Sequence, residues 1–395
     1  MIDLTLADAG AALAPDFTLT LSGKDITRNV SERLISLTLT DNRAFDADTL
    51  TLEIDDSDGM VELPARGAVL ALSLGWKGSG LIDKGTFTVD GVTFSGAPDR
   101  VSIKAHSADF RGSLNVKREA SYHNTTLSAL VGLVAARNGL KSAVASTLAD
   151  IAIAHIDQSM ESDIAFLTRL AGKNGAEATI KNGSVLFLQP GRGTTVSGQP
   201  IAPLAITRRA GDSHAFTIAD RMAYTGVIAS WLNTAAPESQ ASSVTLQRKP
   251  TAASSASIAH PRAQAPLPGG QGKREDYIMG EPANAFVLTD SFNSKEEAVR
   301  AAKAKWDALQ RSAATFSINL AMGRADLYPE TPVTVSGFKR VIDAQTWTIK
   351  NIEHSLSDRG FTTKVVLEAL LDNIEYEESI KRRVNNVSGW RKTVG

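Results

Sequence analysis

The chain has 395 residues, which suggests two to four domains at roughly 100–200 residues each. It carries 42 basic and 43 acidic side chains for a formal net charge of −1, so its overall charge does not favour nucleic acid or an anionic membrane. The absence of cysteine excludes disulfides, thiolate metal sites and cysteine nucleophiles, and it fits assembly in a reducing cytoplasm. The first residues do not read as a signal peptide, and no run of about 18 apolar residues predicts a transmembrane helix.

The first 115 residues predict β structure. Apolar residues alternate with Thr and Ser in six short runs, at 17–21, 34–40, 50–54, 69–74, 86–94 and 101–105. Alternation with a period of two is typical of half-buried antiparallel strands. We therefore expect a small, tube-like β-barrel over residues 1–115.

Residues 116–195 predict a small α/β insert domain. One helix is expected to begin after Thr125 and to end at Gly139, and a second to begin after Ser159 and to end at Gly175. Their apolar stripes are Leu127, Leu130, Val131 and Val134, and Ile164, Leu167, Leu170 and Ala171. Asn182-Gly183, between two alternating runs, predicts a hairpin with a type I′ turn.

Residues 196–375 predict a second tube-like β-barrel. Its strands are expected at 206–209, 221–231, 314–321, 346–356 and 361–370, the last two joined by a hairpin loop at 357–360. A helix at 294–311 should begin with a capping box of Ser294 and Glu297 and bury Val299, Ala302, Trp306 and Leu309. The region 233–282 predicts a long flexible loop, since its first forty residues are rich in Ala, Ser, Pro and Gln.

The predicted fold class is therefore mainly β with an α/β insert: two tube-like antiparallel β-barrel domains plus a small α/β domain. No repeat of fixed period is visible, and it stays open whether the two β modules are copies of one fold. Residues 376–395 form a basic C-terminal tail. We expect that truncation after Asn373 leaves folding intact.

Two residue sets could hold a metal, but neither has the required pattern. The acidic run Asp55, Asp56, Asp58 and Gly59 lacks the Glu that an EF-hand loop needs at its twelfth position, where Arg66 stands, so we expect a solvated turn. The histidines are not spaced as ligands on one helix, and we expect no metal site and no cofactor. They are His106, His123, His155, His214, His260 and His354.

Catalytic chemistry has one weak candidate. Asp157, Glu161 and Asp163 cluster at the start of the second predicted helix, where paired carboxylates could serve a glycosidase. Interaction with the positive end of the helix dipole explains them more simply. No nucleophile elbow, phosphate-binding loop or dinucleotide fingerprint occurs, so we predict no catalytic residues and no small-molecule substrate.

The basic tail is the one candidate binding segment. Its cations could dock on an acidic partner or simply be solvated, and the sequence does not decide between the two. No aromatic residues interleave with them, so direct recognition of nucleic acid is not expected. The residues concerned are Lys381, Arg382, Arg383, Arg391 and Lys392.

Three long segments, in this order, resemble the late control protein D family of temperate phages with contractile tails. They are DNRAFDADTLTLEIDDSDGMVELPARGAVLALSLGW (41–76), GTFTVDGVTFSGAPDRVSIKAHSADFRGSL (85–114) and HIDQSMESDIAFLTRLAGKNGAEATIKNGSVLFLQPG (155–191). The resemblance covers most of residues 1–230 and continues more loosely to about residue 372. Family members are similar to the N-terminal part of type VI secretion spike proteins.

The resemblance implies a structural baseplate hub in the virion, assembled in the host cytoplasm. It implies a homotrimer whose two barrels per chain form a six-barrel ring between the hexameric tail tube and the trimeric spike, with the tape-measure protein in or near the channel. The chain carries no fused spike, so the spike should be a separate protein. Two other functions stay open: a tail-tip module that binds peptidoglycan or surface glycan through the insert, and a cell-wall hydrolase.

Overall fold

In the computed structural model the chain forms two compact units. The first unit contains residues 1–171, 176–217 and 315–370, and the second contains residues 172–175, 218–314 and 371–395. No helix in the described part of the chain is long and apolar enough to cross a membrane. The described residues are 14–44, 47–107, 113–181, 183–218, 224–232, 241–248, 284–311, 314–369 and 376–382.

The first β module consists of six antiparallel strands around one core. The strands are β1 (Pro15–Leu21), β3 (Leu34–Asp41), β4 (Thr49–Asp55), β5 (Val69–Trp76), β6 (Leu81–Ser95) and β7 (Arg100–His106). They lie in the order β3-β4-β7-β6-β5-β1, and the two-residue β2 (Lys24–Asp25) follows β1. A short helix, α1 (Thr27–Ser31), joins β2 to β3. Alternate residues of every long strand point into the shared core, as the period-two pattern predicts.

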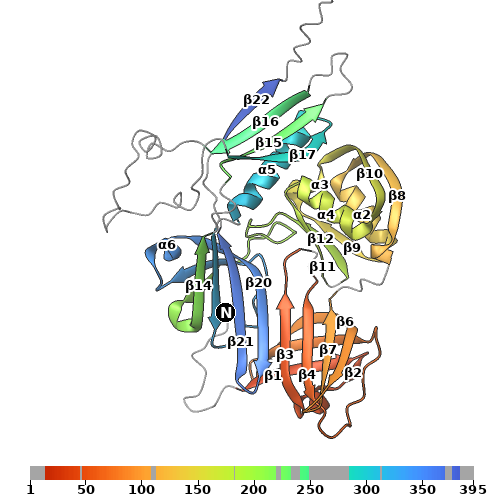
Figure 1. Cartoon of the computed structure of the whole chain (residues 1–395), viewed down its shortest axis with the longest axis vertical. Coiled ribbons are helices and arrows are strands. Elements are labelled where there is room, and N and C mark those ends of the chain that lie inside the picture. Colours follow the sequence, from red (N-terminus) through yellow and green to blue (C-terminus); the bar gives the residue numbers. More distant parts are fainter. Residues whose placement is uncertain are drawn as a thin grey trace, which may run out of the picture. The chain divides into compact units, whose positions relative to one another are not determined.

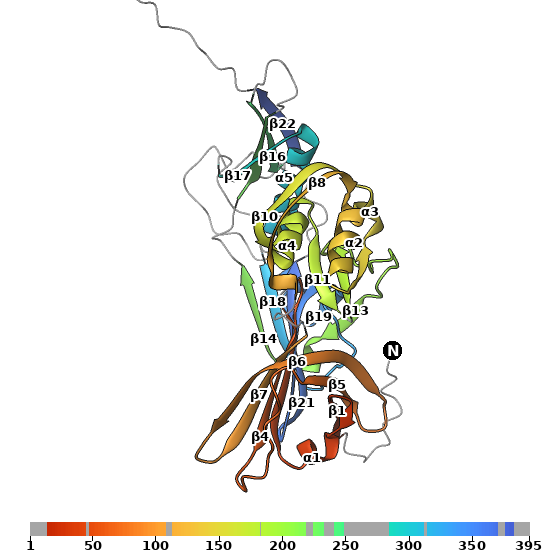
Figure 2. The ribbon, with the colours of Figure 1, turned by 90° about the vertical axis from the view of Figure 1, so that its right-hand side faces the viewer.

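The insert follows as a separate α/β layer (Figure 2). A curved ribbon of β8 (Lys117–Thr126) and β10 (Ala152–Ser162) lies beside α2 (Leu127–Arg137) and α4 (Asp163–Lys173). A small sheet completes it, made of β9 (Lys141–Val144), β11 (Glu177–Lys181) and β12 (Ser184–Leu188), and α3 (Ser146–Ala149) lies between β9 and β10. The β11–β12 hairpin is confirmed, with Gly183 at a φ of +68°, while Asn182 lies outside the described residues.

The helices of the insert confirm the predicted stripes but correct their first residues. Thr126, one residue later than expected, caps α2 by accepting a hydrogen bond from the Ala129 N–H. Ser162 accepts from the Ala165 N–H at α4. The prediction of Ser159 was wrong because β10 continues through a bulge to residue 162. In α4 the buried aromatic residue is Phe166, and Ile164 is only half-buried.

The second β module also has six strands and joins the first edge to edge. They are β13 (Leu204–Thr207), β14 (Gly211–Ile218), β18 (Ala314–Leu320), β19 (Pro332–Ser336), β20 (Thr346–Ser357) and β21 (Gly360–Ala369), and α6 (Arg340–Asp343) precedes β20. The predicted hairpin between β20 and β21 is confirmed. β3 pairs with the second half of β20, so both modules belong to one 13-stranded sheet (Figure 1).

The two β modules have the same topology. When the six long strands of each module are numbered along the chain, their spatial order is 2-3-6-5-4-1 in both. The 3-6, 6-5 and 5-4 pairings are antiparallel in both modules. Strands 1 and 4 are antiparallel in the first module, as β1 and β5, but parallel in the second, as β13 and β19. The modules are therefore two versions of one fold, a point on which the sequence pattern was silent.

Irregularities recur at equivalent places in the two modules. The fifth strand of each contains one extra residue against the sixth strand, Asp90 in β6 and Lys350 in β20. Immediately before the bulge, Val89 exchanges two backbone hydrogen bonds with Gly67–Ala68, and Ile349 does the same with Glu330–Thr331. With the two bulges aligned, residues 86–95 of β6 correspond to residues 346–355 of β20.

The second unit is a four-stranded sheet with a helix on one face. The strands lie in the order β17 (Ala285–Phe292), β15 (Gly226–Leu232), β16 (Ala241–Arg248) and β22 (Tyr376–Arg382), and α5 (Lys295–Arg311) packs on them. The capping interaction is confirmed, since Ser294 accepts from the Glu297 N–H and Glu297 accepts from the Asn293 N–H. Trp306 and Leu309 are buried, and several alanines complete the stripe in place of Val299, which is half-buried.

This unit corrects three predicted boundaries. The second β module does not span 196–375 as one barrel, because β15, β16, β17 and α5 form a sheet and helix with their own core. The predicted loop 233–282 contains β16, whose Val244 and Leu246 are fully buried. Two apolar residues in a Ser- and Thr-rich run were too weak a signal. The predicted tail begins with β22, and the rest of the loop and of the tail lies outside the described residues.

The pairing of β22 with β16 changes the expected effect of truncation. A chain ending after Asn373 loses a seven-residue ladder with β16, and we expect the second unit to lose several kcal/mol, since each hydrogen bond contributes about 0.5–1.5 kcal/mol. A chain ending after Val384 keeps β22 and serves as the matched control. Limited proteolysis followed by mass spectrometry measures the difference, and equal cleavage within 226–311 in both chains would contradict it.

Candidate functional site

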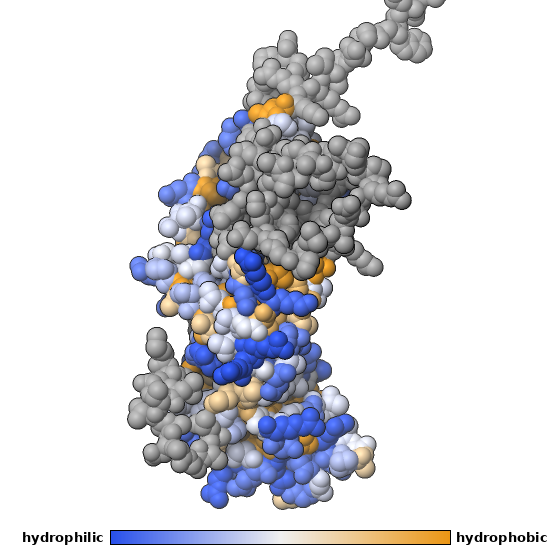
Figure 3. Space-filling view, turned by 90° about the vertical axis from the view of Figure 1, so that its left-hand side faces the viewer, coloured by the Kyte–Doolittle hydropathy of each residue, from blue (hydrophilic) through white to orange (hydrophobic). Residues whose placement is uncertain are grey.

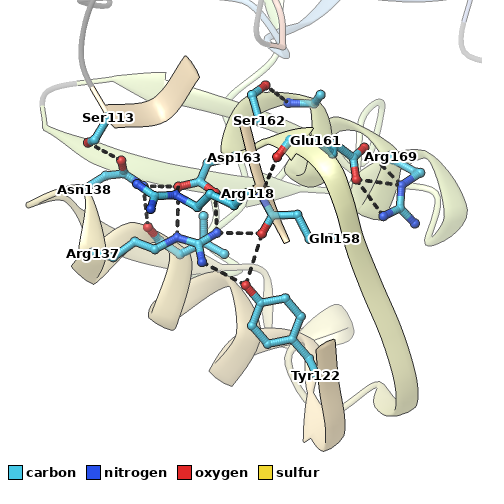
Figure 4. Close-up of polar contacts among 12 residues, drawn as sticks. Ser113, Arg118, Tyr122, Arg137, Asn138, Gln158, Glu161, Ser162, Asp163 and Arg169 are labelled. Atoms are coloured by element: carbon cyan, nitrogen blue, oxygen red, sulfur yellow. Dashed lines mark hydrogen bonds and ion pairs between the residues drawn. The ribbon is translucent and has the colours of Figure 1, made fainter. Parts of the chain in front are cut away.

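Two of the carboxylates considered for catalysis, Asp163 and Glu161, are held in polar contacts of the insert (Figure 4). Asp163 is fully buried at the start of α4 and accepts hydrogen bonds from Arg137 Nε at 2.9 Å, Asn138 Nδ2 at 2.8 Å and Gln158 Nε2 at 2.9 Å. Burial alone would raise the pKa of Asp163, but these hydrogen bonds outweigh it and lower the pKa. A carboxylate kept ionised and fully hydrogen-bonded in this way holds the insert together.

The other two carboxylates also have partners. Glu161 forms an ion pair with Arg169, at 2.7 Å between Oε2 and Nη2. Asp157 accepts from Ser121 Oγ at 2.6 Å and contacts His155 Nε2 at 3.0 Å. The ion pair and hydrogen bonds account for both carboxylates without general acid–base chemistry.

The histidines lie apart from one another, with one exception. His123 and His155 face each other across the β8–β10 ribbon, with 3.1 Å between their Nδ1 atoms. His106 contacts Asp90, His214 packs edge-on against Phe338, and His354 is buried. His260 lies outside the described residues. In the described ranges no three His, Asp or Glu side chains are arranged to hold a metal ion.

The acidic run after β4 is a turn. Asp55 accepts from the Ser57 N–H and Asp58 forms an ion pair with Arg33, at 2.5 Å. Gly59 has a φ of +67° and donates its N–H to the Asp56 carbonyl. The carboxylates therefore serve as turn caps here. Of the tail cations, Lys381 and Arg382 end β22, and Arg383, Arg391 and Lys392 lie outside the described residues.

The most heavily charged buried site of the first unit joins its two modules and the insert. Arg43 follows β3, and its side chain is 9% exposed. Its guanidinium forms ion pairs with Glu330 and Glu368 of the second module and, at 3.4 Å, with Glu177 of the insert. Glu330 also accepts a hydrogen bond from the Gly191 N–H at 2.6 Å. We call these four charged residues the junction cluster.

Glu330 shows why the junction cluster matters to the fold. Its φ is +69°, and its equivalent in the first module is Gly67, at a φ of +89°. Glycine adopts this left-handed conformation freely, whereas another residue there costs roughly 1–2 kcal/mol. The second module has glutamate there despite this cost. Its carboxylate forms an ion pair with Arg43 and accepts a hydrogen bond from the Gly191 N–H.

A second ionic contact ties the insert to the first module. Lys181 of β11 lies 2.5 Å from Asp41 and 3.5 Å from Asp48. Burial raises the pKa of Asp48 to about 6, although Lys181 acts in the opposite direction. Sequence patterns did not find these residues. The one available signal was Glu368, a lone charge in the apolar strand run 365–370, which indicates a buried partner.

His354 makes the strand contact between the modules sensitive to acid. It lies on β20 opposite Leu39 of β3 and is fully buried. The Thr363 hydroxyl accepts from the Arg324 N–H and so is free to donate to His354 Nδ1, at 2.9 Å. Burial lowers the pKa of His354 to about 3.

We therefore expect the first unit to lose stability as the pH falls below about 6.5. The pKa of His354 is about 3 in the folded chain and near 6.5 in the unfolded chain. Between these two values only the unfolded chain takes up the proton, so the free energy of unfolding falls by up to about 1.4 kcal/mol for each pH unit. A His354→Phe variant should lack this contribution. Urea unfolding of the wild-type protein and the variant at pH 7.5, 6, 5 and 4 measures it. Above pH 7 the difference in unfolding free energy between the two proteins reports the change in packing alone. If this difference stays constant below pH 6, the prediction is contradicted.

The first unit contains a duplicated β module with a charged junction, and the candidate catalytic carboxylates take part in structural contacts. These features fit a structural role. The chain belongs to the phage tail baseplate hub (GPD) family, whose model matches residues 44–360. Its place is thus the tail baseplate of the virion, where it has a structural role as a hub protein.

Individual relatives agree with this assignment. The chain is 54% identical over 382 residues to the probable baseplate hub protein of Escherichia phage 186, covering 95% of this chain and 98% of that protein. It is 54% identical to the corresponding protein of Escherichia phage P2, covering 95% and 99%. The fold is similar to a 43 kDa tail protein of prophage MuSo2 from Shewanella oneidensis, with a TM-score of 0.61, 14% identity and coverage of 90% and 98%.

Proposed function

We propose that three copies of this chain form a ring that adapts a hexameric tail tube to a trimeric spike. The observation that supports it is the duplicated β module: each chain presents two versions of one fold, joined side by side through β3 and β20. Three such chains supply six similar modules with threefold symmetry. Head-to-tail contacts of this kind close into rings when the rotation allows.

In this proposal the partners are the tail tube protein, the spike protein and other baseplate proteins, with the tape-measure protein in or near the channel. Contact of the C-terminal cations with such a partner stays a prediction. The role is architectural, without catalysis or a small-molecule substrate. The junction cluster supports it, because a rigid hub needs its modules and insert held in one arrangement.

The alternative of a glycan-binding insert has less support. A carbohydrate platform needs exposed aromatic rings. Phe166 and Phe187 are fully buried, and Tyr122 is half-buried and stacks on Phe166 with 5.5 Å between ring centroids. These three aromatic residues serve the core of the insert.

The proposal is tested by the solution mass of the purified protein. Light scattering behind a sizing column is run on the protein alone and mixed with the tube and spike proteins of the same phage. We expect a mass of three chains, either alone or with the spike. A monomer that binds neither protein would overturn the proposal. Clearing in a zymogram of purified cell wall would instead support the alternative hypothesis of a cell-wall hydrolase.

A further inference from the structure

The contact between the two modules of one chain shows how a module binds its neighbour. β3, the second strand of the first module, pairs antiparallel with β20, the fifth strand of the second. The pairing uses the part of β20 that follows the bulge at Lys350, from Ile352 to Ser357. A module thus offers two different edges: its second strand, and its fifth strand beyond the bulge.

The same two edges remain open at the far ends of the sheet. β14, the second strand of the second module, is the end strand of the sheet, with β18 as its one neighbour among the described strands. In β6, the fifth strand of the first module, residues 91–95 pair with β7, and no described strand pairs with their other side. Figure 1 shows β14 and β6 at opposite ends of the row of strands.

Residues of β6 beyond its bulge are more exposed than the equivalent residues of β20, as expected for a strand edge that no neighbour covers. By the shared register, Phe94 of β6 corresponds to His354 of β20. His354 is fully buried at the contact with β3, whereas Phe94 is 56% exposed. Likewise Ile352 is buried and its equivalent, Val92, is half-buried.

The edge strand β14 carries little of the protection that open edges usually have. Soluble proteins shield such edges with charged side chains, above all lysines, with prolines or with very short strands. β14 is eight residues long, has neither lysine nor proline, contains Asp212 as its one acidic residue, and is at least partly exposed at every position. In the view of the side on which β14 lies, the coloured surface mixes hydrophilic residues with small hydrophobic patches (Figure 3). Such a surface is better suited to pairing between strand edges than to a broad apolar contact.

We propose that β14 of one chain pairs antiparallel with residues 91–95 of β6 in a second copy, repeating between chains the contact that β3 makes with β20 within one. This rests on the ring proposed above and names the strands that close it. The two edges differ, so the contact runs head to tail, and Phe94 is covered as His354 is covered within the chain.

The contact between chains is expected to be weaker than the one within the chain. The internal contact is reinforced by Arg43 and Glu330, but the position of Glu330 is occupied by Gly67 in the first module. The carboxylate that forms an ion pair with Arg43 at the internal contact is therefore absent from the equivalent position of the first module. Such a contact can form during assembly without trapping free chains in open-ended polymers.

The first test uses disulfides, because the chain has no cysteine of its own. Ala215→Cys in β14 is combined with Thr93→Cys, Phe94→Cys or Ser95→Cys in β6, and the protein is oxidised in its assembled form. At least one pair should give covalent ladders up to the ring. Thr38→Cys with Ser355→Cys, which face each other in the register of β3 and β20, is the internal control and should give a monomer-sized band.

The second test uses Phe94→Asp, with Met60→Asp as the matched control, since Met60 is 74% exposed in the same module. Phe94→Asp should raise the concentration needed for assembly by at least about tenfold, because the contact would bury an unpaired charge. The melting temperature of the single chain should not change, and Met60→Asp should assemble normally. A ring that forms normally with Phe94→Asp and gives no cross-link overturns this strand pairing and leaves the ring intact. If the wild-type chain forms no ring with its partners, both this strand pairing and the proposed ring are overturned.

Discussion

An Arg43→Met variant is expected to be about 3–5 kcal/mol less stable than the wild-type protein, because removing one member of a buried ionic cluster leaves the other charges unpaired. Arg43 forms ion pairs with Glu177, Glu330 and Glu368 together. These carboxylates come from the insert and the second module. Their mutual repulsion would therefore separate parts that the wild-type chain holds together.

Urea unfolding at pH 7 measures this loss. Arg28→Met is the matched control: Arg28 pairs with Glu32 on α1, its side chain is 90% exposed, and such surface pairs contribute at most about 1 kcal/mol. Arg43→Lys should fall between the two, since lysine keeps the charge and lacks the planar guanidinium. Equal midpoints for Arg43→Met and Arg28→Met would show that the junction cluster does not stabilise the first unit.

A Leu167→Asp variant is expected to destabilise the insert by a similar amount, roughly 3–5 kcal/mol. Leu167 is fully buried in α4 among the apolar side chains of α2, β10 and β12. An aspartate there would place its charge among these apolar side chains. The change also removes a large side chain from a closely packed region.

Leu133→Asp provides the control, since it makes the same substitution on α2 at a position that is 51% exposed. It should cost less than about 1 kcal/mol, mainly through helix propensity. Thermal unfolding and hydrogen exchange of the insert measure both variants. An unchanged melting temperature for Leu167→Asp would show that this face of α4 is not core.

The predictions that held depend on short-range patterns. The strands of the first module, the stripe of α2, the capping interaction of α5 and the β20–β21 hairpin were all predicted from spacing within about ten residues. The misplaced caps of α2 and α4 also lie within this range, and they differ by one and three residues from those observed, Thr126 and Ser162. Local preferences identify an element well and its first residue less well.

The errors concern which strands share a sheet. The sequence pattern assigned 196–375 to one barrel, yet β15, β16 and β17 form a separate sheet on which α5 packs, and β16 pairs with β22 from the supposed tail. Nothing in the alternation of a strand states which distant strand lies beside it. The same holds for Arg43 and Glu368, which are 325 positions apart.

The amino-acid sequence alone determined the β-rich class, the α/β insert, the absence of cysteine chemistry and, through three ordered segments, the family, because all of these are written in local composition and order. Only the tertiary structure decided that the two β modules share one topology and that Glu330 takes the place of Gly67. It alone decided that, among the described strands, none pairs with the outer edge of β14 or of residues 91–95 of β6, whereas β3 and β20 pair with each other. The reason is physical: periodicity encodes which side of a strand is buried, whereas pairing between strands depends on the packing of segments hundreds of residues apart.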